Sequence, residues 1–438
     1  NHVAAIERDL AAGELTNARV LATDFANLPE DLGRFEFLVL HGVFSWVAPE
    51  VRGQILAIAQ QHLAPGGLLL VSYNAMPGWA HLQPIRGILR QYAALRQGDS
   101  VQRIREALDY TRFIRDKKAK YFEDNPLAAA YVEALLKQDS RYLAHEYLNE
   151  HWTSFYFSEV AEMFGSAGLA FVGSLPIHTN FWDLCVRPEF QELFRTTSNR
   201  LVTESHKDFC ANTAFRWDIY ASQPRLIQSP AERFRQVDDL YFRAARANIT
   251  LPHQANLGVV TSTVQGPLYE TLLKRLGSTS LRLSEILADQ SLSGTPQPEL
   301  MRAVDAGVAL GLFDVTAGPV GEGAATVGTT VNIVSPLNRS ILRDDALGGR
   351  PVTLASVASG TGHTLGDFEA AILHELSSGG SAGLVQRVEA RLSSSGRSLQ
   401  QDGKPVNDPT ARQKLVELAC TNFTTGSLPQ LARLGIVS

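Results

Sequence analysis

The amino-acid sequence predicts a protein of the α/β class that continues into two mainly helical modules. Two apolar runs, at 35–40 and 68–74, are separated by a segment with helical periodicity. A strand, a helix and a second strand in this order are typical of a βαβ unit with parallel strands. The periodicity of residues 269–312 and 333–438 predicts helices in the second half. At 438 residues, the chain has room for two to four domains.

The first part of the chain alternates helices and strands. The predicted elements are a helix at 3–15, a strand at 18–25, a strand at 35–40, a helix at 49–63 and a strand at 68–74. The strand at 35–40 is almost wholly apolar, which is expected of a central strand covered by helices on both faces. The breaker Ala64-Pro65-Gly66-Gly67 ends the second helix.

The pattern turns helical from Trp79 to Gly168, and the strands at 169–173 and 214–220 are expected to form an antiparallel edge pair. Three helices within 269–310, followed by a short tail at 311–315, predict a winged-helix-like module. The expected domains are a core at 1–78 and 169–222, a helical insertion at 79–168, a winged-helix-like middle domain at 223–316, a linker at 317–332 and a C-terminal helical domain at 333–438.

Composition narrows the function classes. The net charge of −5 argues against nucleic acid and against an anionic membrane surface, because both select basic faces. No apolar run reaches the roughly 18 residues that a membrane span needs. The cysteines, Cys185, Cys210 and Cys420, are far apart, so neither a disulfide framework nor a zinc site is expected. A reducing compartment, the cytoplasm, fits this pattern best.

Polar and aromatic residues follow three predicted strands. The first ends in Asp24-Phe25, the second is followed by His41-Gly42-Val43-Phe44-Ser45-Trp46-Val47, and the third leads into Ser72–Trp79. Ligands of open parallel sheets bind outside the carboxyl ends of the strands, so these tips are candidates for one site. The structural alternatives are that Asp24 caps a turn and that the tryptophans anchor loops on the core.

A second cluster, His145-Glu146-Tyr147, lies in the helical insertion. An imidazole, a carboxylate and a phenol this close together can orient an amine or take its proton. The alternative is an exposed helical turn with one buried tyrosine, and spacing alone favours it. The sequence contains neither a phosphate-binding Gly-x-x-x-x-Gly-Lys-Ser/Thr loop, a His-Glu-x-x-His motif nor a Gly-x-Ser-x-Gly elbow.

The chain resembles bacterial methyltransferases that carry a C-terminal methyltransferase regulatory domain. The matching blocks are His41–Val47, Leu63–Gly67, Ser72–Asn74, Pro77–Trp79, His145–Leu148, Asp208-Phe209 with Asn212 and Phe215-Arg216, Ser335–Leu337 with Arg339, and Gly403–Pro405 with Asp408-Pro409. The blocks span nearly the whole chain, more sparsely after residue 250. The rickettsial-type protein lysine methyltransferases look like members of the same family.

The resemblance implies a class I, Rossmann-like methyltransferase core with a helical insertion, S-adenosylmethionine as cofactor, and a homodimer. It implies that Asp24, Phe25, His41 and Gly42 bind the cofactor. It also implies that the acceptor is bound by Ser45, Trp46, Asn74 and Trp79, and that catalysis involves Tyr73, His145, Glu146 and Tyr147.

Two features depart from the family pattern. Phe44 stands where the family usually has tyrosine. The glycine-rich first loop and the acidic residue after the second strand, which hold the cofactor, are not in this sequence. The chain also opens at Asn1 directly in a helical pattern. We therefore expect an N-terminally truncated core, with its first strands missing, that is inactive by itself and leaves a sheet edge open.

The chemistry implied is an in-line displacement at a methyl group, in which the protein aligns the reactants and excludes water. A protein lysine is the expected acceptor, and desolvation would lower its pKa from about 10.4. The alternatives are a small-molecule acceptor, a winged-helix DNA regulator and a protein-interaction role for the C-terminal modules. The segment at 298–305 has one Arg and two acids, which disfavours the DNA reader.

Overall fold

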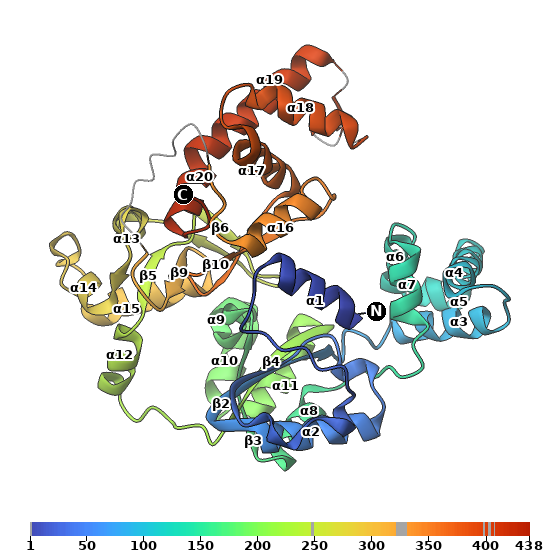
Figure 1. Ribbon diagram of the computed structural model, residues 1–438. Coiled ribbons are helices and arrows are strands. Elements are labelled where there is room, and N and C mark those ends of the chain that lie inside the picture. Colours follow the sequence, from blue (N-terminus) through green and yellow to red (C-terminus); the bar gives the residue numbers. More distant parts are fainter. Residues whose placement is uncertain (1, 247–248, 321–330, 397–398, 402–403, 407) are drawn as a thin grey trace. The chain divides into compact units, whose positions relative to one another are not determined.

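The structure is a computed structural model that describes residues 2–438 except 247–248, 321–330, 397–398, 402–403 and 407 (Figure 1). The chain divides into two compact units. Unit 1 comprises Asn1–Ala22, Ile227–Ala255 and Thr263–Ser438, and unit 2 comprises Thr23–Leu226 and Asn256–Ser262. The domain boundaries predicted from the sequence stay a prediction, although residues 1–22 cluster with unit 1 rather than with the predicted core.

Unit 2 is built on a four-stranded sheet of order β1-β2-β4-β3. The strands are β1 (Phe35–Leu40), β2 (Leu63–Asn74), β3 (Leu169–Leu175) and β4 (Phe215–Ser222). β1 and β2 are parallel and are joined by helix α2 (Pro49–His62), so the predicted βαβ unit is present. β4 runs antiparallel to both β2 and β3, so the predicted antiparallel pair is present as well, with β3 at the edge.

One face of this sheet holds the core of the unit. Helices α8 (Phe157–Ser166) and α11 (Arg200–Ala211) contact each other, and α8 packs against the sheet. The buried cluster between α8 and the strands includes Phe44, Val71, Tyr73, Val160, Phe164 and Tyr220. Val71 and Tyr73 occupy alternate positions of β2 and therefore point to the same face of the sheet.

The prediction that the strand at 35–40 is central and covered on both faces is wrong. β1 is an edge strand, and the side chains of Phe37 and Val39 are 71% and 68% exposed. Leu38 and Leu40 point to the opposite face and pack against the core. The apolar run predicts that both faces of the strand are buried. In the described part of the chain, other residues cover only one face of β1.

The predicted strand at 18–25 is also corrected. Residues 15–24 form no strand, and a short 3-10 helix, η1 (Phe25–Asn27), follows them. A strand needs a neighbour for its backbone N–H and C=O groups, and the described residues provide none here. The Asp24 carboxylate instead accepts from Asn27 N at 3.0 Å and caps η1.

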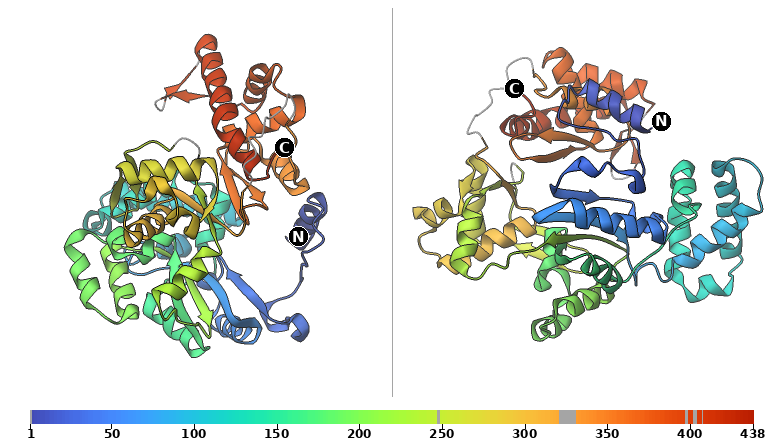
Figure 2. Two further views of the ribbon diagram at one scale, coloured as in Figure 1. Left: turned by 90° about the vertical axis from the view of Figure 1, so that its left-hand side faces the viewer. Right: turned by 60° about the horizontal axis from the view of Figure 1, so that its bottom comes forward.

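The helical insertion of unit 2 has its own core. Its helices are α3 (Gln83–Ala94), α4 (Ser100–Asp116), α5 (Lys120–Asp124), α6 (Pro126–Leu135) and α7 (Ser140–Tyr147). Figure 2 shows them grouped together beside the sheet. Buried residues such as Ile85, Leu89, Ile104 and Val132 hold them together. The remaining short helices of the unit are η2 (Glu30–Leu32), η3 (Phe44–Trp46), η4 (Ile177–Asn180), α9 (Trp182–Cys185) and α10 (Pro188–Thr196).

The middle part of unit 1 is a small α/β module. Its strands are β5 (Tyr241–Ala244), β8 (Leu281–Arg282) and β9 (Phe313–Thr316). A separate two-stranded sheet consists of β6 (His253–Asn256) and β7 (Thr261–Val264), of which Asn256–Ser262 fall in unit 2. The helices of the module are α12 (Pro230–Asp238), α13 (Pro267–Ser278), α14 (Leu283–Leu287), η5 (Gln290–Leu292) and α15 (Gln297–Ala309). β5 pairs antiparallel with β8 and β9 in a three-stranded sheet of order β8-β5-β9.

The C-terminal part of unit 1 is mainly helical, as predicted. Its elements are α16 (Pro336–Asp345), β10 (Val352–Ser356), β11 (Thr361–Leu365), α17 (Asp367–Gly379), α18 (Leu384–Ser394), β12 (Gln400–Gln401), β13 (Lys404–Pro405), α19 (Pro409–Asn422), the π-helix η6 (Phe423–Ser427) and α20 (Leu428–Arg433). Helix α1 (His2–Ala12) contacts α16. Residues 321–330 of the predicted linker and Gly403 of the matching block Gly403–Pro405 lie outside the described residues. Among the described helices, none is both long and apolar enough to cross a membrane.

Candidate functional site

The carboxyl ends of β1 and β2 meet at one edge of the unit 2 sheet. The Ser72 hydroxyl lies 3.0 Å from His41 Nδ1 and accepts a hydrogen bond from Gly42 N at 2.9 Å. Gly42 has φ +67°, and a Cβ there would meet open space. His41 and Gly42 are exposed, so this strand end presents a backbone turn and an imidazole to solvent.

Ser45 and Asn74 lie together behind this edge. The Ser45 hydroxyl accepts from Asn74 N at 2.9 Å, Thr153 N donates to Ser45 O at 2.8 Å, and Phe155 N donates to Asn74 O at 2.9 Å. Asn74 is only 3% exposed, and its Nδ2 has no hydrogen-bond partner in the described part of the chain. A buried amide donor without a partner is costly, which makes Asn74 the best-supported ligand contact among the predicted residues.

Other residues predicted to contact the cofactor or the acceptor have structural roles instead or are less exposed to a ligand. The Asp24 carboxylate caps η1 and also accepts from Asn27 Nδ2 at 2.7 Å, which is the structural alternative considered for it. Trp46 is half-buried in η3. Trp79 is buried in the core of the insertion, with its ring 4.8 Å from that of Trp152 and 6.1 Å from that of Tyr131.

The loop after β2 is anchored to β4 by close backbone contact. Ala75 N donates to Ala214 O and Gly78 N to Thr213 O, both at 2.9 Å. A Cβ on Gly78 would lie 2.6 Å from backbone atoms of Thr213 and Ala214. Only glycine lets these two segments of the backbone approach each other this closely. Gly78 therefore fixes the position of the loop that follows Asn74.

We expect Gly78→Ala to lower the free energy of unfolding of unit 2 by about 1–3 kcal/mol, because backbone must move to admit the methyl group. Gly87→Ala is the matched control, since Gly87 lies inside α3 with open space at its Cβ. Alanine there should stabilise by about 0.5–1 kcal/mol. Urea unfolding of both variants measures the difference, and equal midpoints would contradict the close-approach argument.

Tyr73 points away from the Asn74 side chain, because successive residues of a strand face opposite sides. It is fully buried, and its hydroxyl donates to Asp218 Oδ2 at 2.5 Å. Burial and the nearby Asp218 carboxylate raise the pKa of the Tyr73 phenol well above its ordinary value. The hydroxyl is therefore a protonated hydrogen-bond donor held inside the unit.

The His145-Glu146-Tyr147 turn lies at the end of α7. His145 is exposed, whereas Tyr147 is buried and hydrogen-bonds through its hydroxyl to that of Tyr131. Burial raises the pKa of the Glu146 carboxyl, against the opposing effects of His145 and Arg86. The structure thus agrees with an exposed turn beside one buried tyrosine, with Glu146 as its one perturbed carboxylate.

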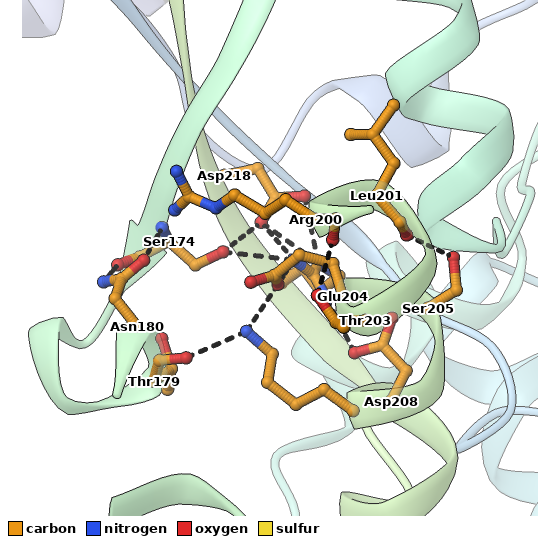
Figure 3. Close-up of polar contacts among 12 residues, drawn as sticks. Ser174, Thr179, Asn180, Arg200, Leu201, Thr203, Glu204, Ser205, Asp208 and Asp218 are labelled. Atoms are coloured by element: carbon orange, nitrogen blue, oxygen red, sulfur yellow. Dashed lines mark hydrogen bonds and ion pairs between the residues drawn. The ribbon is translucent and has the colours of Figure 1, made fainter. Parts of the chain in front are cut away.

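A buried ionic cluster near the same sheet edge was not singled out as a site from the sequence. Its members are Glu204, Lys207 and Asp208 of α11, Arg216 and Asp218 of β4, and Ser174 of β3. Figure 3 shows Glu204 of α11 in the centre of the cluster with Ser174 and Asp218, whereas Leu201 of the same helix points away. Asp208 and Arg216 belong to the blocks that match the methyltransferase family. No sequence pattern, however, indicates that the helix of Asp208 contacts the strand of Arg216.

Arg216 is the centre of this cluster. Its guanidinium contacts Asp208 Oδ1 at 2.7 Å, Glu204 Oε2 at 2.9 Å and Asp218 Oδ1 at 2.9 Å. Burial alone would lower the pKa of Arg216, but the carboxylates of Asp218 and Asp208 raise it well above the ordinary value. Burial raises the pKa of Asp208 to about 6, although Arg216 opposes the shift.

A family model described as a predicted methyltransferase regulatory domain matches residues 139–222. The match covers α7 through β4 and includes all members of the ionic cluster. In the described residues, no group of three or more His, Cys, Asp or Glu side chains is placed to hold a metal ion.

Two relatives and two solved structures extend this match. An uncharacterized protein of Synechocystis sp., sll1526, is 29% identical over 409 residues, which is 93% of this chain and 79% of that protein. An uncharacterized protein of Rickettsia prowazekii, RP789, is 27% identical over 214 residues, 48% of this chain and 38% of that protein. PKMT2 from Rickettsia typhi, solved in complex with AdoHcy, has a TM-score of 0.70 at 20% identity, over 99% of this chain and 87% of that chain. PKMT2 solved in a second structure has a TM-score of 0.67 at 19% identity. The resemblance predicted from the sequence is confirmed, and the PKMT2 likeness establishes the fold.

Proposed function

We propose that this chain belongs to an S-adenosylmethionine-dependent methyltransferase and that the acceptor is the amine of a protein lysine. The observation that supports it most is the sheet edge at His41, Gly42 and Asn74, in a fold similar to that of PKMT2, which was solved with AdoHcy. Ligands of open α/β sheets bind at this kind of edge. The regulatory-domain match at 139–222 supports the same class of enzyme.

The residues of this sheet edge offer contacts for only part of S-adenosylmethionine. The unpaired Asn74 Nδ2 offers a buried donor, and Gly42, with positive φ and open space at its Cβ, lets a ligand approach the backbone. In the described chain, no strand leads through a glycine-rich turn into a helix, which is the arrangement that holds the anionic end of a nucleotide-like cofactor. We therefore propose that the 438 residues alone bind the cofactor too weakly for activity.

Bound S-adenosylmethionine supplies a methyl group on a positively charged sulfur. The residues of this chain would orient it and exclude water, with Gly42 and Asn74 at the strand ends. A lysine acceptor must lose a proton before it can react, and partial burial lowers its pKa. Glu146, half-buried and with a raised pKa, is the proposed proton acceptor beside His145.

Several finer assignments belong to the same proposal. A small-molecule acceptor is the second candidate, favoured by the buried position of Ser45 and Asn74, which leaves little room for a peptide backbone.

The order α13, β8, α14, α15, β9 supports a winged-helix-like middle domain. Separated free cysteines support a cytoplasmic protein. A homodimer rests on the family resemblance alone.

Calorimetric titration with S-adenosylhomocysteine tests the proposal, with PKMT2 as the positive control. We expect no measurable binding by the 438 residues. A version extended by a glycine-rich strand–turn–helix segment should bind, and Asn74→Ala in that version should weaken binding at least tenfold, about 1.4 kcal/mol. Asn422→Ala, on the exposed face of α19, is the control.

Each outcome has a defined meaning. Tight binding by the unextended chain would contradict the claim that it lacks the anionic-end site. Binding by neither version would contradict a methyltransferase site at this sheet edge. With the extended version, labelled methyl transfer to protein pools rather than to metabolites would separate lysine from a small-molecule acceptor.

A further inference from the structure

A cavity of about 150 Å³ lies beside the ionic cluster of unit 2. It is lined at the amino end of β4, at the carboxyl end of β3 and along α11. Its apolar walls come from Leu175, Cys185, Ala211, Phe215 and Trp217, and Asp208 forms a polar part of the wall. The Phe215 and Trp217 rings lie edge to face with centroids 4.7 Å apart. An apolar cavity of this volume is large enough for a six-carbon ring.

The charges around this cavity do not balance. Three carboxylates, Glu204, Asp208 and Asp218, face two cations, Lys207 and Arg216, which leaves one negative charge. Asp208 is 2% exposed, and only its Oδ1 is bonded, to Arg216. Its Oδ2 has no hydrogen-bond partner among the residues that the structure describes. A buried carboxylate oxygen without a partner calls for a proton or a cation.

Neither Lys207 nor His178 supplies a cation to the unpaired Oδ2 of Asp208. Lys207 Nζ is held 2.5 Å from Glu204 Oε2 and donates to Thr179 O at 2.9 Å. His178 also lines the cavity, and burial together with Lys207 lowers the pKa of its imidazole, so it is neutral near pH 7. Burial raises the pKa of the Cys185 thiol to about 12, so this group adds no charge.

We propose that this cavity binds an alkylammonium group, with the ammonium on Asp208 and the aliphatic stem against the apolar wall that Phe215 and Trp217 form. The lysine side chain of a protein and a free short alkylamine both carry this group. Binding restores electrical balance to the cluster, and the apolar walls take the methylene stem out of water. The aromatic ring faces add attraction for the cation. The cavity lies toward β3 on the sheet edge that also carries Asn74, whose register partner is Phe215, and the proposal does not depend on methyl transfer.

Titration of the 438-residue chain with n-butylammonium chloride at pH 8 tests this directly. We expect saturable binding with a dissociation constant on the order of millimolar. 1-Butanol, which has the same number of heavy atoms and no charge, should bind at least tenfold more weakly. The fluorescence of Trp217 and calorimetry both report occupancy.

Two variants of different kinds locate the site. Asp208→Asn keeps the shape and removes the charge, and it should weaken butylammonium binding at least tenfold. Ala211→Leu fills the cavity and leaves every charged residue in place, and it should abolish binding while the far-UV spectrum stays that of the unmodified chain. The second variant keeps the test decisive if the first one is poorly folded.

The dependence on pH gives an independent readout. Glu204, Asp218, Lys207, Arg216 and His178 face Asp208, and the carboxyl of Asp208 has a pKa of about 6. Alkylamines stay charged far above this value, so binding should fall as Asp208 takes up a proton. Affinity at pH 5 should be about tenfold lower than at pH 8. Peptides with a central lysine, compared with norleucine, distinguish a protein ligand from a free amine. No saturable binding of any amine, or binding unchanged in Asp208→Asn, would overturn the proposal.

Discussion

Arg216→Met is expected to lower the free energy of unfolding of unit 2 by about 3–5 kcal/mol. Arg216 is 4% exposed and bridges Glu204, Asp208 and Asp218. Methionine keeps much of the side-chain volume but removes the positive charge, and three buried carboxylates are then left with Lys207 alone. Removing one partner of a buried ion pair is far more damaging than removing an exposed one, because the remaining charges cannot be solvated.

Urea unfolding followed by tryptophan fluorescence measures this effect in unit 2 specifically. All five tryptophans lie within Thr23–Leu226, so their emission reports that unit. Arg195→Met is the matched control, because Arg195 forms an exposed ion pair with Glu192 at 3.6 Å. Its loss should cost less than about 1 kcal/mol. Similar midpoints for the two variants would show that the cluster contributes no more than a surface pair.

Phe164→Ala is expected to destabilise unit 2 by about 3–5 kcal/mol. Phe164 is fully buried in α8, with ring centroids 5.4 Å from Phe44 and 4.6 Å from Tyr220. Alanine would leave a cavity between the helix and the sheet, since neither backbone can close on it. The loss combines the apolar surface no longer removed from water with the missing packing contacts.

The control for this variant is Phe113→Ala on α4, where the ring is 55% exposed. We expect a change within about 0.5 kcal/mol there, as for most surface substitutions. The same fluorescence-monitored unfolding compares the two variants. The dependence of the free energy of unfolding on urea concentration should have the same slope in both. A loss below 1 kcal/mol for Phe164→Ala would mean that α8 is not part of the cooperative core.

Local patterns predicted the elements whose signals lie within a few residues. The βαβ unit, the β3–β4 pair and the three helices of the middle module were expected from apolar runs, breakers and periodicity. The prediction of a strand at 18–25 failed because a short segment with apolar residues does not encode a neighbour to pair with. The central position given to 35–40 failed for a related reason, since one-sided and two-sided burial look alike in a short apolar run.

The candidate site was only partly predictable. Strand-end residues such as His41, Gly42 and Asn74 could be found because parallel strands bring their carboxyl ends together. The contacts of Arg216 with Glu204 and Asp208 join β4 to α11, and no spacing rule relates the two elements. Tyr73 was predicted to face a substrate, yet its donor role toward Asp218 follows from strand alternation and a partner 145 residues away.

The exposed side of β1 bears on how this chain behaves in solution. Its outer backbone groups have no neighbouring strand in the described residues, and Phe37 and Val39 lie on the surface beside them. An open, apolar strand edge is a template on which another chain can add a strand through main-chain hydrogen bonds. Concentrated samples will therefore tend toward self-association driven by β-edge pairing, a tendency that charged substitutions at Phe37 or Val39 are suited to suppress.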